Sequence, residues 1–522
     1  MIKILSILII GFLFFSGFGV IAFPEYVEEN NNGSYIKKTN YNSINISWNK
    51  HVIDDSFDYA FGVQAFDLDN DGDCDVLGAA QDGDFIAWWR NEGGYPINWT
   101  KFIIDDDFDG ATSVFAIDID GDLDVDVVGS ASYDNEIALW RNEGGNPPIW
   151  MKYTIKSGFE FAHEVYCHDL DMDGDIDILG TSSDNHQIAW WRNDGANPIS
   201  WTEQIICNDF FGAKSVRVAD IDNDGLLDII GAAILDNKII WWRNRGGEPI
   251  IWDEHVIDDD FDGAHRAEVC DLDHDGDIDI VGAAYFDQEI SWWRNDGGEP
   301  IIWTKQVITT NFKGACIGLP VDIDYDGDID VVGTAQQGND VALFRNDGGN
   351  PFVWTKIIID SFFQGAWPGF VYDIDDDGDI DILAGASFAD KLAWWESDLN
   401  QKPYIPERPS GPTSGRPNIE YNYSSSTIDP QDDNLFYLFN WGDGNDSGWL
   451  GPFNSGETCE ATYYWESQGN YEIKVKARDI YESESDWSDS LVVSMPKTKS
   501  INNFNPWIIR LIQQFPILEY LL

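Results

Sequence analysis

Short runs of alternating apolar and polar residues, separated by turns rich in Gly and Asp, extend over most of the chain. Between residues 252 and 300, four such runs lie at residues 252–257, 264–272, 277–284 and 289–294. Their period of two and their hairpin-length turns predict β-strands. No run in this stretch has the 3.6-residue period of a helix, so we expect four antiparallel strands that share one sheet.

The same pattern returns seven times with a period of 51 residues. The first marker is the Asp that opens an acidic cluster, and it occurs at Asp67, Asp118, Asp169, Asp220, Asp271, Asp322 and Asp373. The second marker is a single Trp, at Trp48, Trp99, Trp150, Trp201, Trp252, Trp303 and Trp354. A period near 50 residues is typical of a solenoid, a propeller or an array. Four strands per repeat predict an all-β fold, a seven-bladed β-propeller over residues 46–396, because the turns of a β-solenoid are usually much shorter.

The seventh repeat lacks a Trp-led strand after its last aromatic pair, Trp394-Trp395. We expect residues 48–53, at the start of the array, to supply this missing outer strand. Such pairing joins the first and last repeats by backbone hydrogen bonds and removes the exposed sheet edges of a linear array.

The segments before and after the array differ from it in composition. Residues 1–22 contain one basic residue and then an apolar run, which predicts a secretory signal peptide or an uncleaved anchor. Residues 397–418 are rich in Pro and predict an extended linker. Residues 419–496 show a new strand pattern, clearest over 469–477, and predict a small β-sandwich.

The last segment, residues 497–522, carries an amphipathic apolar stripe that is halted by Pro516. It is too short and too interrupted to span a bilayer. Contact with a membrane surface, a sorting signal and packing on the sandwich remain open as its role.

Charge and cysteine content limit the choice of partners. The 93 acidic and 31 basic residues give a net charge of −62, which repels the phosphates of nucleic acids and anionic membrane surfaces. We therefore expect no nucleic acid partner, and we expect the chain to be a monomer. The six Cys residues have no repeated spacing, which predicts individual buried thiols and not a disulfide framework.

The acidic clusters follow the spacing Asp-x-Asp-x-Asp-Gly-Asp-x-Asp, with carboxylates at loop positions 1, 3, 5 and 9. Inward-pointing carboxylates, a Gly at position 6 and the backbone carbonyl of position 7 match the beginning of an EF-hand loop. The Glu at position 12 and the flanking helices are missing, so we predict a β-hairpin loop closed by the Asp at position 9. Oxygen ligands without His or Cys favour Ca²⁺ over zinc or copper, and one ion per repeat gives about seven.

The predicted metal-binding residues are Asp67, Asp69, Asp71, Asp73 and Asp75; Asp118, Asp120, Asp122, Asp124 and Asp126; Asp169, Asp171, Asp173, Asp175 and Asp177; Asp220, Asp222, Asp224, Leu226 and Asp228; Asp271, Asp273, Asp275, Asp277 and Asp279; Asp322, Asp324, Asp326, Asp328 and Asp330; and Asp373, Asp375, Asp377, Asp379 and Asp381. Leu226 holds position 7, where only the carbonyl is used. Leu123 replaces the Gly of position 6, so it is strained if its φ is positive, and we expect this loop to bind most weakly.

These clusters are each followed by Ile or Val and a further apolar residue, and then by Gly in six repeats and Ala384 in the seventh. They resemble the FG-GAP/VCBS repeats of integrin-α-type β-propellers. The motif that names the family is echoed by Phe210-Phe-Gly-Ala213 and Phe261-Asp-Gly-Ala264. The resemblance implies calcium in each matching loop and extracellular binding or adhesion. Trp441-Gly-Asp-Gly444 and Gly469-Asn-Tyr471 make residues 419–496 similar to a PKD-type, immunoglobulin-like domain, which implies a spacer or binding module.

Functional residues are expected where the repeats differ from one another. The most variable positions follow a constant Ala and lie at the end of the innermost strand opposite the acidic loop, roughly 20 Å from it. The candidate ligand-binding residues there are His163, Glu164, Lys214, Arg217, His265, Arg266 and Trp367. This mixed cationic and aromatic set, converging around a central channel, predicts an anionic or carbohydrate ligand. Neutral variation at an exposed loop is the alternative.

No nucleophile, zinc-protease or phosphate-binding motif occurs in the sequence, so we assign no catalytic residue. The sequence predicts an exported, calcium-binding β-propeller that recognises an extracellular protein or polysaccharide ligand, in solution or at the cell surface. A secreted polysaccharide-active hydrolase or lyase, which uses the propeller face and is assisted by His163 or His265, is the alternative.

Overall fold

The computed structural model describes residues 46–196, 198–399, 402–431, 433–481 and 483–495. The predictions for residues 1–22 and 497–522 lie outside these ranges. The chain divides into two compact units with the main boundary along the sequence near residue 400, and each unit is described by itself. The described residues form strands and turns, and they contain no helix that is long and apolar enough to cross a membrane.

The first unit contains seven antiparallel four-stranded sheets, built alike in the described residues. The first strands are β2 (Ala60–Phe66), β6 (Ala111–Ile117), β10 (Ala162–His168), β14 (Ala213–Ala219), β18 (Ala264–Cys270), β22 (Ala315–Val321) and β26 (Ala366–Tyr372). The second strands are β3 (Asp75–Ala80), β7 (Asp126–Ala131), β11 (Asp177–Ser182), β15 (Asp228–Ala233), β19 (Asp279–Ala284), β23 (Asp330–Ala335) and β27 (Asp381–Ala386).

The third and fourth strands complete each sheet. The third strands are β4 (Phe85–Asn91), β8 (Glu136–Asn142), β12 (Gln187–Asn193), β16 (Lys238–Asn244), β20 (Glu289–Asn295), β24 (Asp340–Gly349) and β28 (Lys391–Ser397). The fourth strands are β5 (Trp99–Asp105), β9 (Trp150–Ser157), β13 (Trp201–Cys207), β17 (Trp252–Asp258), β21 (Trp303–Thr309), β25 (Phe352–Asp360) and, for the last sheet, β1 (Trp48–Asp54).

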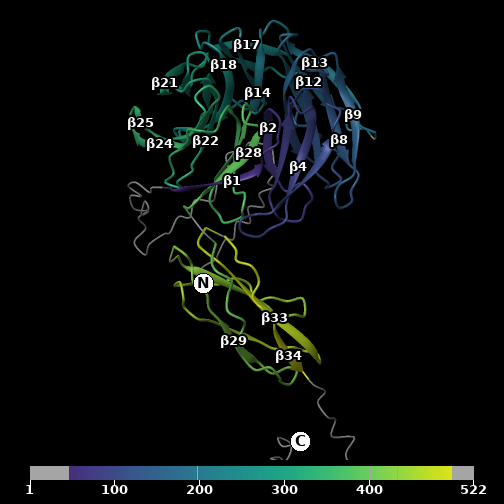
Figure 1. Cartoon of the computed structure of the whole chain (residues 1–522), viewed down its shortest axis with the longest axis vertical. Coiled ribbons are helices and arrows are strands. Elements are labelled where there is room, and N and C mark those ends of the chain that lie inside the picture. The colour runs from purple at the N-terminus through teal and green to yellow at the C-terminus, as the bar shows by residue number, and fades with distance from the viewer. Residues whose placement is uncertain (1–45, 197, 400–401, 432, 482, 496–522) are drawn as a thin grey trace, which may run out of the picture. The chain divides into compact units, whose positions relative to one another are not determined.

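The pairing of β1 with β28 confirms the predicted origin of the last outer strand. The two strands are antiparallel, with Trp48 opposite Ser397, and Figure 1 shows purple β1 beside green β28. Each first strand also contacts the first strands of the neighbouring sheets, and β2 contacts β26. These contacts are consistent with a β-propeller.

The sheets are offset by one strand from the four-strand unit that the sequence suggested. The run at residues 252–257 is β17, and it pairs with β16 of the preceding sheet, not with β18–β20. The reason is the tight connection after Asn244, which folds β17 back onto β16 as a hairpin, whereas the turn after Asp258 leads the chain into the next sheet.

The aromatic pairs are buried because each sheet packs against its neighbours on both faces. Trp88 and Trp89 alternate to opposite faces of β4, and both are buried. Gly180 in β11 allows this packing, because a Cβ there would lie 2.6 Å from Ile137 and 2.9 Å from Trp191. The six cysteines are free and five are buried, as predicted.

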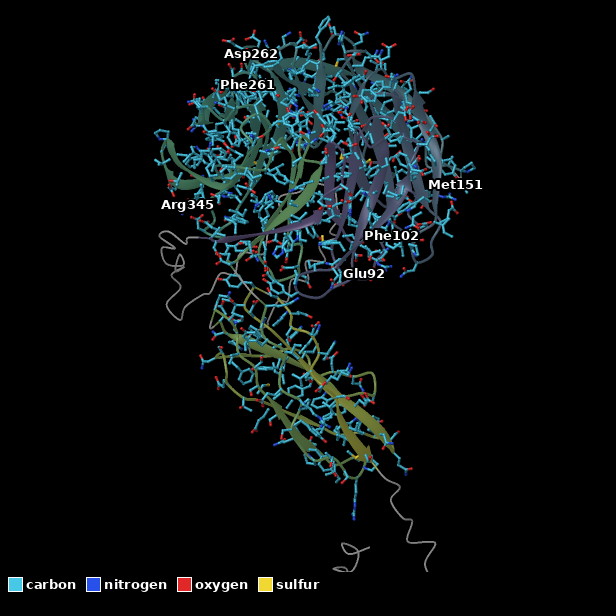
Figure 2. The ribbon with its side chains drawn as sticks, in the orientation of Figure 1. Glu92, Phe102, Met151, Phe261, Asp262 and Arg345 are labelled. Carbon is cyan, nitrogen blue, oxygen red and sulfur yellow. The ribbon has the colours of Figure 1, made fainter. Side chains whose placement is uncertain are left out.

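The Phe of each Phe-x-Gly-Ala motif packs edge-to-face on an aromatic ring of the third strand. Phe261 lies 4.9 Å from Trp293 between ring centroids and is buried, whereas the adjacent Asp262 is exposed (Figure 2). The motif therefore fixes the turn before each first strand through its aromatic ring.

The second unit has the two-sheet pattern expected of a sandwich. One sheet pairs β29 (Tyr421–Ser425) with β32 (Cys459–Tyr463). The other has the order β31 (Leu450–Phe453), β30 (Leu435–Asn440), β33 (Gly469–Arg478) and β34 (Leu491–Met495). Trp441 and Trp465 are buried in its core.

Part of the segment at residues 397–418, expected to be a linker, runs along this second unit. The backbone N–H of Ser410 donates to the Ser424 carbonyl at 2.8 Å, and that of Gly415 donates to the Ser494 carbonyl at 3.1 Å. The extended backbone that Pro favours leaves N–H and C=O groups free to pair with a sheet edge.

Candidate metal loops and inner cluster

Each acidic loop joins the first strand of a sheet to the second, and its position-1 carboxylate holds the turn. In the first loop, Asp67 accepts hydrogen bonds from the backbone N–H groups of Asp71 and Gly72 at 3.1 and 3.0 Å. The position-5 carboxylate of Asp71 accepts from the N–H of Asp73 at 3.1 Å. These bonds direct alternate carboxylates into the loop without using a side chain at position 7.

The position-9 carboxylate is buried at the base of the loop. Asp75 accepts from the backbone N–H groups of Leu68 at 3.1 Å and Asn91 at 2.8 Å. Burial is the main cause that raises the pKa of Asp75 to about 8 and that of Asp330 to about 9, against the hydrogen bonds. The same cause raises the pKa to about 7 in Asp126, Asp177, Asp228 and Asp279.

The position-3 carboxylate provides a direct test of whether a cation fits. Six of these Asp residues have one buried carboxylate oxygen, Oδ1, with no hydrogen-bond partner: Asp69, Asp120, Asp171, Asp222, Asp273 and Asp324. Leaving a buried acceptor unpaired is costly, and a bound cation removes that cost. The unpartnered oxygens therefore fit a metal ion in these loops.

Neighbouring carboxylates in the loops are close enough to share one ion. The described residues contain seven groups in which three or more ligand atoms lie within 4.8 Å of one another, for example those of Asp169, Asp171 and Asp177. Two oxygens that each lie 2.3–2.6 Å from one Ca²⁺ can be separated by that much. Five of the groups are Asp67, Asp69 and Asp71; Asp118, Asp120 and Asp122; Asp169, Asp171 and Asp177; Asp220, Asp222 and Asp228; and Asp271, Asp273 and Asp279.

The second loop contains the predicted departure from the common backbone. Leu123 has φ of 77° and is 80% exposed, which confirms the positive φ at position 6. In the first loop, Gly72 holds this position with φ of 97°. A side chain with a Cβ is strained in this region of φ, whereas Gly is not.

The sequence analysis assigned no role to position 4, which links several loops to one another. The side-chain amide of Asn70 donates to the Leu123 carbonyl of the next loop at 3.0 Å. Asn223 donates to Asp277 at 3.0 Å, and His274 Nε2 donates to the carbonyl of Gly327 at 2.8 Å. Five of the seven loops have a side chain with hydrogen-bonding groups at this position, and this preference is the signal that the sequence contained.

The first strands converge at their other ends on a second set of side chains. We define the inner cluster as the residues that follow the constant Ala: Phe61, Thr112, His163, Lys214, His265, Cys316 and Trp367. Ring centroids of His163 and His265 are 6.3 Å apart, and those of His265 and Trp367 are 4.4 Å apart. Phe61 contacts both His163 and Trp367. The structure thus brings the variable column together.

Two members of the inner cluster are held by neighbouring strands. Nδ1 of His163 donates to the carbonyl of Lys214 at 2.9 Å, and Nδ1 of His265 donates to that of Cys316 at 3.0 Å. A carbonyl can only accept, so each Nε2 carries the lone pair. Burial, and then the Lys214 ammonium, lowers the pKa of His163 well below its usual value and that of His265 to about 3.

An ion network lies beside the inner cluster. Arg217 is 1% exposed and binds Glu268 at 2.7 and 2.8 Å and Glu164 at 3.1 Å. Arg266 pairs with the same two carboxylates. Burial alone would raise the pKa of Glu268, but the two guanidinium groups outweigh it and lower this pKa.

This network changes the predicted character of the site. The sequence analysis described its residues as a cationic and aromatic set, but Arg217 and Arg266 are matched by Glu164 and Glu268. The reason is register: Glu164, Arg217 and Glu268 lie on successive first strands, where side chains of opposite charge can meet. Lys214 keeps its charge without such a partner among the described carboxylates.

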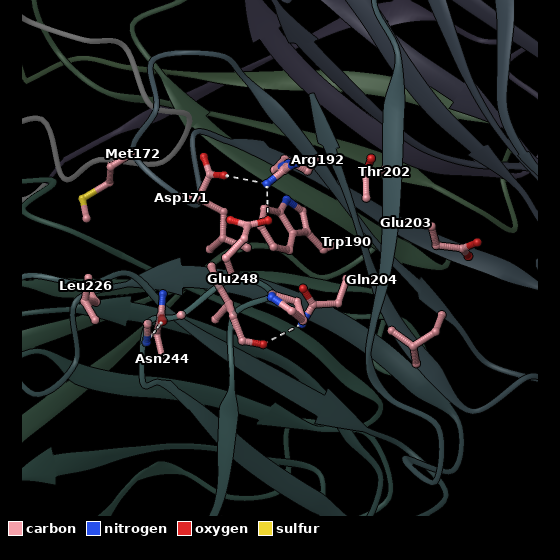
Figure 3. A pocket seen from close by; sticks show the side chains of 16 residues that line it. Asp171, Met172, Trp190, Arg192, Thr202, Glu203, Gln204, Leu226, Asn244 and Glu248 are labelled. Atoms are coloured by element: carbon pink, nitrogen blue, oxygen red, sulfur yellow. Dashed lines mark hydrogen bonds and ion pairs between the residues drawn. The ribbon is translucent and has the colours of Figure 1, made fainter. Parts of the chain in front are cut away.

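A groove of about 610 Å³ lies between the third and fourth sheets of the first unit (Figure 3). Arg192 crosses it to Glu248 at 2.9 Å, and Gln204 donates to the Ile250 carbonyl at 2.9 Å. Arg90 and Arg243 reach the equivalent loops of other sheets in the same way. The groove therefore belongs to the repeated contact between sheets.

Comparisons with known proteins agree with the repeat pattern. Residues 67–129 and 169–231 match the family model of the FG-GAP-like repeat, and these stretches contain four of the acidic loops. A search of curated proteins found no match.

Three solved structures show partial likeness. The PKD domain of an M14-like peptidase from Thermoplasmatales archaeon SCGC AB-540-F20 is 43% identical over 19% of this chain and 99% of that chain, with a TM-score of 0.18. A luciferin-regenerating enzyme is 9% identical, and the match covers 52% of this chain and 87% of that chain, with a TM-score of 0.33. Salmonella alpha-2-macroglobulin is 9% identical, and the match covers 86% of this chain and 39% of that chain, with a TM-score of 0.17.

Proposed function

We propose that the chain is an exported, calcium-stabilised β-propeller of seven blades that recognises an extracellular ligand, with a PKD-type sandwich as an accessory module. The observation that supports the calcium most directly is the unpartnered, buried position-3 oxygen that recurs in six loops. Export, monomeric state, membrane-surface contact of residues 497–522 and the removal of residues 1–22 are parts of the same proposal.

Electrostatics explains why the loops need an ion. Two carboxylates about 4 Å apart repel by roughly 4 kcal/mol at an effective dielectric of 20. In each loop the side chains of positions 1, 3 and 5, the carbonyl of position 7 and the carboxylate of position 9 would hold the ion. A bound Ca²⁺ turns the repulsion into attraction and joins the first two strands of every sheet.

Single loops offer a matched test of this assignment. The substitution Asp171→Asn changes the carboxylate with the unpartnered oxygen, whereas Asp175→Asn changes a position-7 side chain. We expect calcium titration to show about one ion fewer in Asp171→Asn and no loss in Asp175→Asn. Equal uptake by the two variants would contradict the ligand assignment.

Recognition is assigned to the inner cluster because the repeats differ there and agree in the loops. The enzymatic alternative would be assisted by His163 or His265, but burial lowers the pKa of both imidazoles and makes them weak bases. The carboxylates beside them that could act as acid and base are Glu164 and Glu268. Both carboxylates are bound by Arg217 and Arg266, and the lowered pKa of Glu268 keeps it ionised, so it is poorly suited to donate a proton. The arrangement therefore favours binding over hydrolysis.

An unbiased binding screen tests the function. The exported chain, with calcium and with chelator, is applied to arrays of polysaccharides and extracellular proteins. We expect a ligand that is retained without turnover in calcium and lost in chelator. Release of reducing ends or unsaturated products from a polysaccharide would instead support the enzymatic alternative.

A further inference from the structure

The strongest unassigned feature of the inner cluster is the Nε2 atom of His163. The side chain is 6% exposed, and Nε2 has no hydrogen-bond partner. Because Nδ1 donates its proton to the carbonyl of Lys214, Nε2 is a pure acceptor. A buried acceptor of this kind indicates a missing hydrogen-bond donor.

Lys214 presents the complementary requirement. Its side chain forms no ion pair with any described carboxylate, since Glu164 and Glu268 are occupied by Arg217 and Arg266. Burial lowers the pKa of Lys214 to about 8, and Cys316 and Asp184 only partly oppose this. The ammonium group therefore lacks a counter-charge, which an anionic ligand would supply.

Aromatic rings enclose these two groups. Phe61 and Trp367 lie against the imidazoles, and Lys214 Nζ lies 5.9 Å from the ring of Phe161. Phe161 has φ of 51° at a position where five other repeats have Gly, so an aromatic ring is kept there despite backbone strain. The cavity has a volume of about 60 Å³, enough for a few groups of the size of water.

We propose that the inner cluster binds the carboxylate-bearing edge of a uronic acid residue at the end of an acidic polysaccharide. The carboxylate pairs with Lys214, a hydroxyl group donates to Nε2 of His163, and the apolar face of the sugar ring packs on Trp367. A metal cation is disfavoured by the ammonium group beside both imidazoles. This inference rests on the proposed recognition function and names its ligand class.

The test measures binding of D-glucuronate to the calcium-loaded chain by calorimetry. We expect Lys214→Gln and His163→Phe each to weaken glucuronate binding at least about tenfold. D-glucose, which lacks the carboxylate, should bind neither the unchanged protein nor the variants. Phe is chosen because Phe61 fills the equivalent place in the first repeat. Lys313→Gln, at an exposed position in the turn before β22, is the matched control and should leave binding unchanged.

The pH dependence of the unchanged protein gives a readout that does not depend on a variant folding. Around Lys214, burial lowers the pKa of His163 and His265, so both stay neutral, and it raises the pKa of Cys316 to about 12, so this residue stays a thiol. Arg266 lies nearby in ion pairs with Glu164 and Glu268, and Asp184 is a further carboxylate that acts on Lys214. Burial lowers the pKa of Lys214 to about 8, so glucuronate affinity should fall about tenfold or more between pH 7 and 9.5.

Each outcome decides the inference separately from the proposed function. Absence of glucuronate binding, a flat pH profile or equal binding by Lys214→Gln would overturn it. If the array screen instead finds a neutral glycan or a protein whose binding is lost in the same variants, the ligand class is wrong and the recognition function stands. Inorganic sulfate, which carries charge but no donor, should compete only weakly with glucuronate.

Discussion

The two ends of the first strands contrast sharply in how their residues vary. At one end, all seven loops repeat the same carboxylates, and six keep an unpartnered oxygen at position 3. At the other end, the seven residues of the inner cluster belong to six different types. Each first strand therefore has a repeated cluster of like charges at one end and, at the other end, residues that differ from sheet to sheet.

The difference shows how like and unlike charges are compensated. Each loop holds at least four Asp side chains, and in four loops one Arg lies within 4.0 Å of the position-3 carboxylate. One cation cannot balance so many carboxylates, so most of the compensation must come from outside the chain. Beside the inner cluster, Arg217 and Arg266 compensate Glu164 and Glu268 within the chain. Removing calcium should therefore destabilise the acidic loops, whereas single substitutions should act mainly at the inner cluster and the ion network beside it.

The largest expected effect is that of chelation. A ligand at 100 times its dissociation constant stabilises a site by about 2.7 kcal/mol, and about seven sites add up to a fall in Tm of more than about 15 °C. The sequence of residues 402–495 contains no acidic cluster of this spacing, so we expect the transition of the sandwich that they form to move by less than about 2 °C. Calorimetry of the whole chain with calcium and with chelator checks both. A melting profile that is the same with calcium and with chelator would contradict the assignment of the acidic loops as stabilising metal sites.

The next effect concerns the inner end. Arg217→Met removes the more deeply buried of the two guanidinium groups and leaves Glu164 and Glu268 to share Arg266. We expect a loss of about 3–5 kcal/mol of stability at unchanged calcium uptake. Arg217→Met combined with Glu268→Leu should recover part of this loss, since it removes one of the two charges. Denaturant unfolding in saturating calcium measures the free energies. A loss of calcium from Arg217→Met would show that the two ends are coupled.

The pH dependence of the loop end should change sign with calcium. Without metal, the raised pKa of Asp75 (about 8) and of Asp330 (about 9) means that the folded state binds more protons than the unfolded state above pH 4. The metal-free protein should therefore lose stability as the pH rises from about 5 to 8. With calcium, protons compete with the ion, and stability should fall toward pH 5. Melting curves at both pH values check the inversion.

The smallest effect distinguishes loops from one another. Leu123→Gly removes the strain of a positive φ, so we expect a gain of up to about 1 kcal/mol and tighter calcium binding by the second loop. Leu226→Gly, at a position without positive φ, is the control and should cost about 0.5–1 kcal/mol. The free energy of unfolding, measured at a series of calcium concentrations, compares the two variants. A loss of stability in Leu123→Gly would mean that the leucine makes a useful contact.

Local sequence patterns were enough to predict the features that repeat. A 51-residue period, alternating strands and fixed carboxylate spacing are local properties, so they predicted the strands, the acidic loops and the strand that β1 adds to β28. Which charges meet depends instead on how neighbouring sheets pack. Arg217 lies about one repeat from both Glu164 and Glu268 along the chain, and His163 lies one repeat from Lys214, so no local pattern could predict these contacts or the unpaired Nε2 of His163.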